Sequence, residues 1–371
     1  MNGKGPHPRT CFPFLDDLEI PPAWDTAAGR FVQQGGLVMV LGAPDTGKST
    51  LCRYLVYRAY TAGHQAALVD LDLGQSHLGP PTTLGLGLFP PRRPGDEALH
   101  PDGLCFIGQT SPVGAILEVA VGSRVLVDLG VSRGCTRVVV NTSGLVQGAG
   151  ALILKRAQVE LLRPALILGL QRGRELEPLL RGLGGQDPPD WPLLRLPVAS
   201  RALRKTPEER RTYREERFRR YFQGAGRLAL PWRRLVWDGL PWGHGDPLDI
   251  PDLDHCRRSL GVAPLYGEVQ GRRLVLLLAE PKASPISKNS RDRGEWDQVH
   301  WLTWPGHHFR LVGLLDGRRR TLGLGLILPE PFDPETLALW SPLAAAAVTR
   351  VRFVKVGKIR LNLRGQELNH V

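Results

Sequence analysis

The sequence predicts an α/β protein in which a doubly wound parallel sheet is followed by a β-rich domain. Three observations support this. Short apolar runs alternate with helical segments in the first two thirds of the chain, a glycine-rich loop joins the first run to the first helix, and strand signals dominate after about residue 224. Strands that alternate with helices imply crossover connections, and therefore a parallel sheet with helices on both faces.

The elements of the sheet domain are indicated by continuous apolar stretches with glycine or polar residues at their ends. We expect buried strands at 36–41, 66–71, 137–141 and 165–169. Helical spacing of apolar residues predicts helices over 49–60, 117–129 and 149–162. Residues 1–35 contain many prolines and little helical period, so we expect strands and loops there.

The C-terminal part has the composition of a β domain. Strands are expected at 265–279, 309–315, 321–328 and 351–363, with the turn pair Asp316-Gly317 between two of them. The polar stretch 281–300 is expected to be an exposed loop. The predicted organisation is an N-terminal segment over 1–35, a sheet domain over 36–229 with a lid near 200–222, and a β-rich domain over 230–371.

Composition restricts the class of protein. A chain of 371 residues exceeds the usual size of one core, and 42% apolar with 23% charged residues is typical of soluble globular proteins. The sequence has no apolar stretch of membrane-spanning length and no secretory leader, so we expect a cytoplasmic protein without a membrane partner. Five scattered cysteines without a CxxC pair argue against a disulfide framework or a zinc site.

The glycine-rich loop matches the Walker A pattern in full, Gly42-x4-Gly47-Lys48-Ser49, with a strand before it and a helix after it. Backbone N–H groups and the helix N-terminus can hold phosphates, Lys48 supplies a positive charge, and the Ser49 hydroxyl can hold Mg²⁺. The loop predicts a P-loop protein that binds ATP and Mg²⁺. We assign the nucleotide contacts to Gly42, Ala43, Pro44, Asp45, Thr46, Gly47, Lys48, Ser49 and Thr50.

Two acidic residues follow the second strand, where the carboxyl ends of parallel strands meet the ligand. Asp72 can orient a hydroxyl nucleophile, accept its proton and help to hold the metal ion. The alternative is that Asp70 and Asp72 only cap the next turn. The residue after the third strand is Asn141, where a GTPase would have the Asp of Asp-x-x-Gly, and the sequence lacks the guanine motif Asn-Lys-x-Asp. Both features argue against a GTPase.

The segment 201–220 is rich in arginine and begins a helix at Thr206-Pro207-Glu208-Glu209, which has a Thr cap, a Pro at the first position and acids in the first turn. A hinged basic helix can deliver an arginine to a transferred phosphate. The alternative is a solvated helix held by i,i+4 pairs such as Arg211–Glu215. The net charge of +12 is by itself weak evidence for a phosphate-bearing partner. We give it weight only where basic residues cluster, as they do in the segment 201–220.

Together these motifs resemble the polynucleotide 5′-hydroxyl kinase family, which includes the RNA kinase subunit of the mRNA 3′-end cleavage factor, the ribosomal-RNA processing kinase and their archaeal and bacterial relatives. The resemblance covers most of the chain, and the order of the motifs is more specific than any one of them. It is carried by the P-loop and by the segments 72–76, 79–82, 108–114, 141–148, 214–222, 313–316 and 322–325.

The resemblance implies transfer of the ATP γ-phosphate to the 5′-OH end of RNA or DNA, with the choice of nucleic acid left open. It implies catalytic roles for Lys48, Asp72 and Gln75, with Ser49 and Asp72 at the metal. It assigns the acceptor strand to Gln75, Thr110, Ser111, Thr142, Gly144 and Leu145, and the lid arginines to Arg204, Arg210 and Arg211.

Two positions depart from the family pattern. Leu145 stands where eukaryotic members have Trp, and an aromatic ring there would stack on a base for about 1–3 kcal/mol. Ala115 stands where a His is common, which removes a polar contact to the substrate. Two other functions stay open: an ATP-bound scaffold of an RNA-processing complex with little catalysis, and an NTPase that acts on a protein partner.

Overall fold

The computed structural model describes residues 19–89, 101–183, 191–280 and 296–368. The chain divides into two compact units, Met1–Tyr221 and Phe222–Val371. We call them the P-loop unit and the C-terminal unit and describe each by itself. Among the described residues, no helix has the length and apolar character that crossing a bilayer requires.

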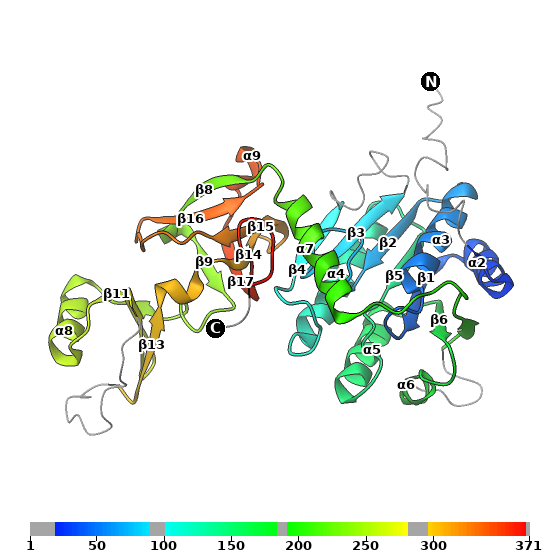
Figure 1. The fold of residues 1–371 in the computed structure, drawn as a ribbon, viewed down its shortest axis with the longest axis horizontal. Coiled ribbons are helices and arrows are strands. Elements are labelled where there is room, and N and C mark those ends of the chain that lie inside the picture. The colour runs from blue at the N-terminus through cyan, green and yellow to red at the C-terminus, as the bar shows by residue number, and fades with distance from the viewer. Residues whose placement is uncertain (1–18, 90–100, 184–190, 281–295, 369–371) are drawn as a thin grey trace. The chain divides into compact units, whose positions relative to one another are not determined.

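The P-loop unit is built on a seven-stranded sheet in the order β4-β3-β2-β5-β1-β6-β7 (Figure 1). The five strands from β2 to β7 in this order run parallel, as predicted, whereas β3 and β4 extend one edge as antiparallel strands. The strands are β1 (Gly36–Gly42), β2 (Ala66–Asp70), β3 (Thr83–Phe89), β4 (Gly103–Phe106), β5 (Arg137–Asn141), β6 (Leu166–Gln171) and β7 (Leu193–Pro197).

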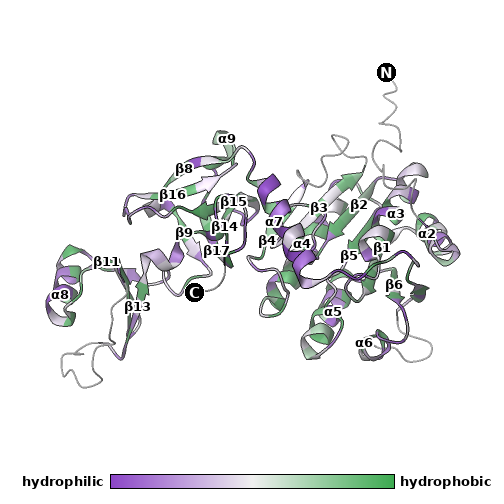
Figure 2. Cartoon of the chain, viewed as in Figure 1, coloured by the Kyte–Doolittle hydropathy of each residue, from purple (hydrophilic) through white to green (hydrophobic). Residues whose placement is uncertain are grey.

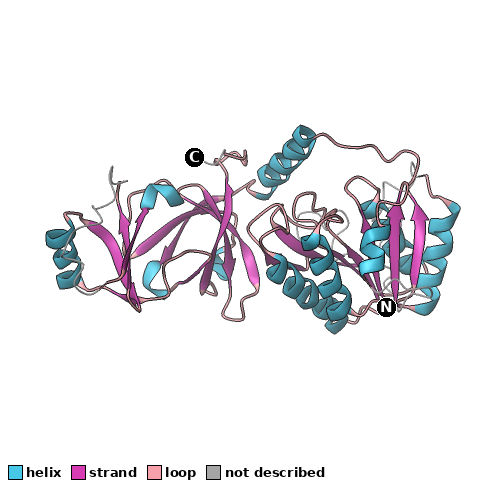
Figure 3. Ribbon diagram, turned by 90° about the horizontal axis from the view of Figure 1, so that it is seen from below, coloured by secondary structure: helices cyan, strands magenta, loops and turns pink. Residues whose placement is uncertain are grey.

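Helices cover both faces of this sheet (Figure 3). Alternate residues of β1 enter two cores: Leu37, Met39 and Leu41 enter one, and Val38 and Val40 enter the other. The first core is completed by α4, α5 and α6, and the second by α2 and α3. The helices are α2 (Pro22–Gln34), α3 (Lys48–Thr61), α4 (Ile116–Ser132), α5 (Ala149–Leu162), α6 (Glu177–Gly182) and α7 (Pro207–Tyr221). The doubly wound arrangement expected from the sequence is confirmed.

The N-terminal segment differs from the expectation of strands and loops, because Pro22–Gln34 forms helix α2. Trp24, Ala27, Ala28 and Phe31 recur at helical spacing and are all buried. Pro22 occupies the first turn, where the missing N–H of proline costs nothing. The proline count therefore misled the prediction, and the part of it that concerns residues 1–18 lies outside the described residues.

The C-terminal unit contains a six-stranded sheet, β8-β16-β15-β14-β17-β9, and a four-stranded sheet, β10-β11-β12-β13. Its strands are β8 (Gly226–Pro231), β9 (Val236–Asp238), β10 (Asp246–Pro247), β11 (Pro264–Gln270), β12 (Arg273–Leu278), β13 (Gln298–Thr303), β14 (Arg310–Leu315), β15 (Thr321–Ile327), β16 (Thr336–Ser341) and β17 (Phe353–Arg360). Its helical elements are η2 (Trp232–Arg234), α8 (Ile250–Leu260), η3 (Trp304–His307) and α9 (Ala345–Val348).

The β-rich character of this unit is as predicted, with differences in detail. The stretch 265–279 is a hairpin of β11 and β12 rather than one strand. Asp316 and Gly317 turn the chain between β14 and β15, as expected. Of the predicted polar loop 281–300, residues 281–295 lie outside the described residues, and β13 begins at Gln298. Trp232 centres the core, with its ring 4.6 Å from that of Trp237 and 5.4 Å from that of Trp242.

Candidate active site

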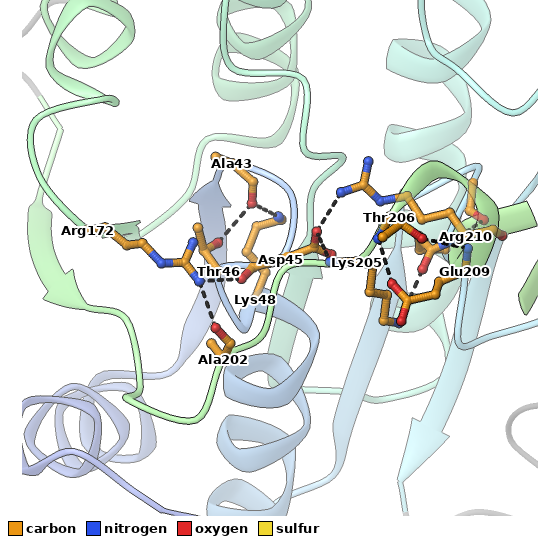
Figure 4. A network of polar contacts seen from close by, with 12 residues as sticks. Ala43, Asp45, Thr46, Lys48, Arg172, Ala202, Lys205, Thr206, Glu209 and Arg210 are labelled. Carbon is orange, nitrogen blue, oxygen red and sulfur yellow. Dashed lines mark hydrogen bonds and ion pairs between the residues drawn. The ribbon is translucent and has the colours of Figure 1, made fainter.

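The phosphate loop connects β1 to α3 and is closed on itself by side chains. The Thr46 hydroxyl and the Lys48 ammonium both donate to the carbonyl oxygen of Ala43, at 2.9 and 2.7 Å (Figure 4). Gly47 has φ +83°, a left-handed conformation that lets the chain turn directly into α3. Lys48 is buried, which lowers the pKa of its ammonium. The lysine is thus held within the loop where the Walker A pattern requires it.

Polar side chains from two neighbouring strands and from the start of α3 meet beside this loop. The amide of Asn141, at the end of β5, donates to Ser49 Oγ at 3.1 Å and to Asp70 Oδ1 at 3.0 Å. Asp70 ends β2, and both strands open at the edge where β1 leads into the phosphate loop. Ser49, Asp70 and Asn141 therefore form one connected cluster at the carboxyl ends of the strands, the usual ligand position of such sheets.

Asp72 caps the next turn with one of its two carboxylate oxygens. Its Oδ1 accepts hydrogen bonds from the backbone N–H groups of Gly74 and Gln75, at 3.1 and 3.0 Å, so it does cap the turn. Its Oδ2 has no hydrogen-bond partner in the described part of the chain. One oxygen thus fixes the carboxylate in place while the other stays available for a substrate or a metal ion.

Asp70 is more deeply buried and more constrained than the sequence indicated. Its oxygens accept hydrogen bonds from the backbone N–H groups of Asp72 and His77 and from the amide of Asn141. Burial, followed by repulsion from Asp72, raises the pKa of Asp70 to about 6. Asp70 is therefore best placed to orient Asn141 and the loop that carries Asp72.

The lid begins with the predicted cap. Thr206 N donates to Glu209 Oε2 at 2.6 Å and Glu209 N donates to Thr206 Oγ1 at 3.1 Å, which is a capping box at the start of α7. Much of α7 is strongly hydrophilic (Figure 2). The predicted start of the basic helix is confirmed.

The lid contacts the tip of the phosphate loop at Asp45 (Figure 4). Arg210 Nη2 lies 2.5 Å from Asp45 Oδ2, and the backbone N–H of Lys205 donates to the same oxygen at 3.0 Å. Arg172 Nη2 donates to the carbonyl oxygens of Asp45 and Ala202, at 3.0 and 2.9 Å. These contacts join the phosphate loop, the segment after β6 and the lid.

The lid also contacts the segment that follows Asp72. The Lys205 ammonium donates to Gln75 Oε1 at 3.3 Å, and the Tyr213 hydroxyl donates to the carbonyl oxygen of Ser76 at 2.9 Å. Arg217 donates to the carbonyl oxygen of Gly79 at 2.7 Å. The predicted acceptor residue Gln75 therefore lies directly against the lid.

The three candidate lid arginines are placed differently. Arg210 contacts the phosphate loop, whereas Arg211 pairs with Glu215 at i,i+4, the alternative that the sequence offered. Arg204 is exposed, with no side-chain hydrogen bond or ion pair to any described residue. Of the three, Arg210 alone has its guanidinium at the nucleotide loop in this structure.

The other candidate acceptor residues lie in two segments, 110–111 and 142–145. Thr110 lies near the Asp72 loop, since a Cβ on Gly74 would come within 3.1 Å of the Thr110 carbonyl oxygen, whereas Ser111 is exposed.

Thr142 is fully buried and its hydroxyl donates to the Val40 carbonyl at 2.8 Å, so its side chain holds the sheet. Leu145 packs against the core. A Cβ on Gly144 would lie 2.9 Å from the Pro44 nitrogen, so only glycine allows this approach to the phosphate loop.

Sequence reasoning missed three residues of this region. Asn141 counted against a GTPase and lay in the family segment 141–148, but it was assigned no contact in the site, although it stands at a strand end. Arg172 has no local sequence signal. Lys155 of α5 is fully buried and donates to the carbonyl and hydroxyl oxygens of Ser143, at 3.1 and 3.3 Å. Its position on the apolar face of α5 was the available signal.

The sheet, the closed Walker A loop and the lid define a nucleotide-binding protein of the P-loop class. Residues 42–224 match the sequence profile described as mRNA cleavage and polyadenylation factor CLP1 P-loop. The chain belongs to this CLP1 P-loop family.

Relatives resemble the chain over most of its length. A protein from Pyrococcus furiosus named polyribonucleotide 5′-hydroxyl-kinase is 28% identical over 354 residues, which cover 94% of this chain and 95% of the relative. One of the same name from Thermococcus kodakarensis is 29% identical over 335 residues, 89% of this chain and 90% of the relative. A CLP1 homologue from Drosophila mojavensis is 29% identical over 338 residues, 86% of this chain and 75% of the relative.

A solved structure supports the fold. The structure of a wild-type Clp1p–Pcf11p (454–563) complex contains a chain that superposes with a TM-score of 0.59 at 14% identity, covering 90% of this chain and 77% of that one. At this identity the likeness concerns the fold alone.

Proposed function

We propose that this protein is an ATP-dependent polynucleotide 5′-hydroxyl kinase that acts on RNA. The observation that carries the proposal is the convergence of the closed Walker A loop, the fixed carboxylate of Asp72 and a lid arginine at one edge of the sheet. The archaeal relatives named as polyribonucleotide 5′-hydroxyl-kinases support the choice of reaction and acceptor.

The residues present fit a magnesium ion. Mg²⁺ prefers oxygen ligands and keeps several of its waters. Ser49 Oγ and the carboxylate of Asp72 supply such oxygens, and Asn141 Oδ1 is a buried acceptor without a partner among the described residues. Bound there, the ion would neutralise charge on the phosphates. Ser49 and Asp72 are the residues that we assign to it, with Asn141 positioning Ser49.

In the proposed reaction the 5′-hydroxyl oxygen attacks the γ-phosphorus of ATP in line with the leaving group. A new O–P bond forms, the bond between the γ-phosphorus and the bridging oxygen breaks, and ADP leaves. Asp72 Oδ2 orients the attacking hydroxyl and accepts its proton. Lys48 and Arg210 stabilise the charge that gathers on the transferred group.

The acceptor strand is assigned to the groups around Asp72. Gln75, Thr110 and Ser111 lie on the segments that adjoin its loop, and Gly144 and Leu145 follow the end of β5. Thr142 contributes through its backbone in this proposal, because its hydroxyl is held by Val40.

The decisive experiment measures transfer of labelled γ-phosphate from ATP to matched 5′-OH RNA and DNA oligonucleotides, with and without Mg²⁺. We expect transfer to RNA that requires Mg²⁺ and is abolished in Lys48→Ala. An oligonucleotide that already carries a 5′-phosphate is the matched control and should accept no label. If ATP remains unconsumed with every 5′-OH acceptor, the protein is a nucleotide-bound scaffold instead.

A further inference from the structure

The C-terminal unit contains two arginines that face each other across neighbouring strands. Arg310, at the start of β14, pairs with Arg360, at the end of β17, in the antiparallel ladder of these strands, next to a register shift between Arg310 and Val312. Like charges at directly opposite positions destabilise a sheet, so this pair needs a compensating partner.

Both guanidinium groups donate to backbone carbonyl oxygens of the turn at 306–308. Arg310 Nε donates to the Gly306 carbonyl at 3.2 Å and Arg360 Nε to the His308 carbonyl at 3.1 Å. No carboxylate of the described residues forms an ion pair with either guanidinium. Elsewhere in the unit arginines do pair with acids, in Arg227–Glu330, Arg272–Asp297, Arg319–Asp238 and Arg320–Asp316. The contrast singles out Arg310 and Arg360.

The pKa values of neighbouring side chains reflect the positive charge of the pair. Burial, followed by the charge of Arg360, lowers the pKa of Arg310. Burial lowers the pKa of His307 to about 4, with further contributions from Arg310, His308 and Arg360. Burial and Arg360 also lower the pKa of His308. Arg310 and the two imidazoles are thus disfavoured in their charged forms, as expected beside a guanidinium without a counter-ion.

The backbone and the imidazoles indicate that the cluster is specifically built. Phe309 has φ +63°, a left-handed conformation that is rare for a bulky residue and is found at functional sites. It is held by hydrogen bonds of 2.8 Å to Ile327 and 2.9 Å from Leu361. His307 is only 5% exposed, and its Nδ1 and the Nε2 of His308 are buried without a hydrogen-bond partner among the described residues.

We propose that Arg310 and Arg360, with His308 beside them, bind a phosphodiester group of a polynucleotide. Two guanidinium groups from opposite strand positions can present several N–H donors to one phosphate, the geometry in which arginine is preferred over lysine. The choice of a polynucleotide over a free phosphate rests on the proposed function, since the acceptor of that reaction carries phosphodiesters along its chain. The site belongs to the C-terminal unit, and none of its residues is among those assigned to catalysis.

The test is the affinity of the full chain for a fluorescent 5′-OH oligoribonucleotide, measured by anisotropy without ATP over a series of salt concentrations. The variant Arg310→Gln/Arg360→Gln is compared with Arg257→Gln/Arg258→Gln, which removes the same charge from two exposed arginines of α8. We expect the first variant to bind about tenfold more weakly, with a log–log salt slope smaller by about 0.7, because the site holds one phosphate and a single-strand phosphate contributes about 0.7. The α8 variant should resemble the wild type. Equal losses in both variants, or none in the first, would overturn the proposal.

A second variant separates binding from a structural role, because Arg310 and Arg360 also brace the turn at 306–308. Arg310→Lys/Arg360→Lys keeps both charges and loses the guanidinium forks, so we expect an affinity between those of the wild type and the glutamine variant. Losses as large as those in the glutamine variant, accompanied by a lowered Tm, would assign the arginines to folding and contradict the proposal.

Competition identifies the source of the phosphate. Inorganic phosphate at the concentration of the salt series should displace the oligoribonucleotide no better than chloride of equal ionic strength. Specific displacement by inorganic phosphate would mean a free-phosphate site and overturn the assignment to a polynucleotide. If the wild type binds and phosphorylates RNA but the glutamine variant binds equally well, this site is wrong while the proposed function stands. If the wild type neither binds nor phosphorylates RNA, the proposed function itself fails.

Discussion

Arg210 of the lid and Asp45 at the tip of the phosphate loop form an ion pair, with 2.5 Å between Nη2 and Oδ2. Burial raises the pKa of Asp45, but the hydrogen bonds from Lys205 and Arg210 outweigh this effect and keep the pKa below its ordinary value. The carboxylate is therefore ionised near neutral pH and occupies the guanidinium that the proposed reaction needs. A triphosphate bound in the loop is a competing anion for the same arginine.

Replacing Arg210 with Ala should lower kcat for 5′-OH phosphorylation by about 10³-fold, because an arginine at the transferred phosphate typically contributes at least this much. The matched control is Arg211→Ala, since Arg211 lies on the same helix but pairs with Glu215. Steady-state kinetics with saturating ATP and RNA measure both. A larger loss of kcat in the Arg211 variant than in the Arg210 variant would contradict our choice of lid arginine.

Asp45→Asn should bind ATP about three- to tenfold more tightly than the wild type. The substitution removes a negative charge beside the phosphates and releases Arg210, and about 1 kcal/mol is a reasonable size for one such charge. Asn tolerates the left-handed backbone of Asp45, whose φ is +59°, so the loop should keep its conformation. Calorimetric titration with a non-hydrolysable ATP analogue measures the change, and weaker binding would show that Asp45 supports the site rather than competes with the nucleotide.

Asp72→Asn tests the acceptor side without disturbing the turn. The Oδ1 of asparagine can still accept hydrogen bonds from Gly74 and Gln75, whereas the second, negatively charged oxygen is lost. We expect kcat to fall by about 10²–10⁴-fold, the usual contribution of a general base, with the Tm almost unchanged. Asp128→Asn, at an exposed position of α4, is the control. Transfer at close to the wild-type rate by Asp72→Asn would remove Asp72 from the mechanism.

The parallel strands and the phosphate loop could be predicted because their signals are local. A fully buried strand such as β1 needs an unbroken apolar run, and the Walker A pattern fixes both the loop and its flanks. Strand β3 could not be predicted in this way, because its sequence TLGLGLF contains glycines that usually indicate a loop. Those glycines are required by packing, since a Cβ on Gly85 would lie 2.3 Å from the carbonyl oxygen of Leu78.

Within the candidate site, too, contacts between neighbouring residues could be predicted and contacts between distant parts of the sequence could not. The capping box at Thr206 and Glu209 is a pattern of adjacent residues and was predicted correctly. The pair between Asp45 and Arg210 joins residues 165 positions apart, and no local rule selects Arg210 over its neighbours. The resemblance to a family predicts a role for the lid, but the contact between Asp45 and Arg210 depends on tertiary structure.

Lys155 allows a test of the buried charge behind the site through the pH dependence of stability. Burial, followed by repulsion from Lys48, lowers the pKa of Lys155 from 10.5 to about 7. Between about pH 7 and 10.5 the Lys155 side chain is therefore protonated to a greater extent in the unfolded chain than in the folded protein. In this window the free energy of unfolding of the wild type should rise with pH relative to Lys155→Met, which has no group to titrate, by up to about 5 kcal/mol. Urea denaturation of both proteins at pH 7, 8, 9 and 10 measures this difference.

The control for this prediction is Lys358→Met, at an exposed lysine of β17, whose difference from the wild type should stay constant over the same pH range. Both comparisons cancel the titration of all other groups. A difference in the free energy of unfolding that rises with pH for Lys155→Met but not for Lys358→Met is therefore due to Lys155. A flat difference for Lys155→Met would mean that the folded protein holds Lys155 as readily protonated as the unfolded chain does. In that case an anionic group, rather than the oxygens of Ser143 alone, would have to stabilise the ammonium.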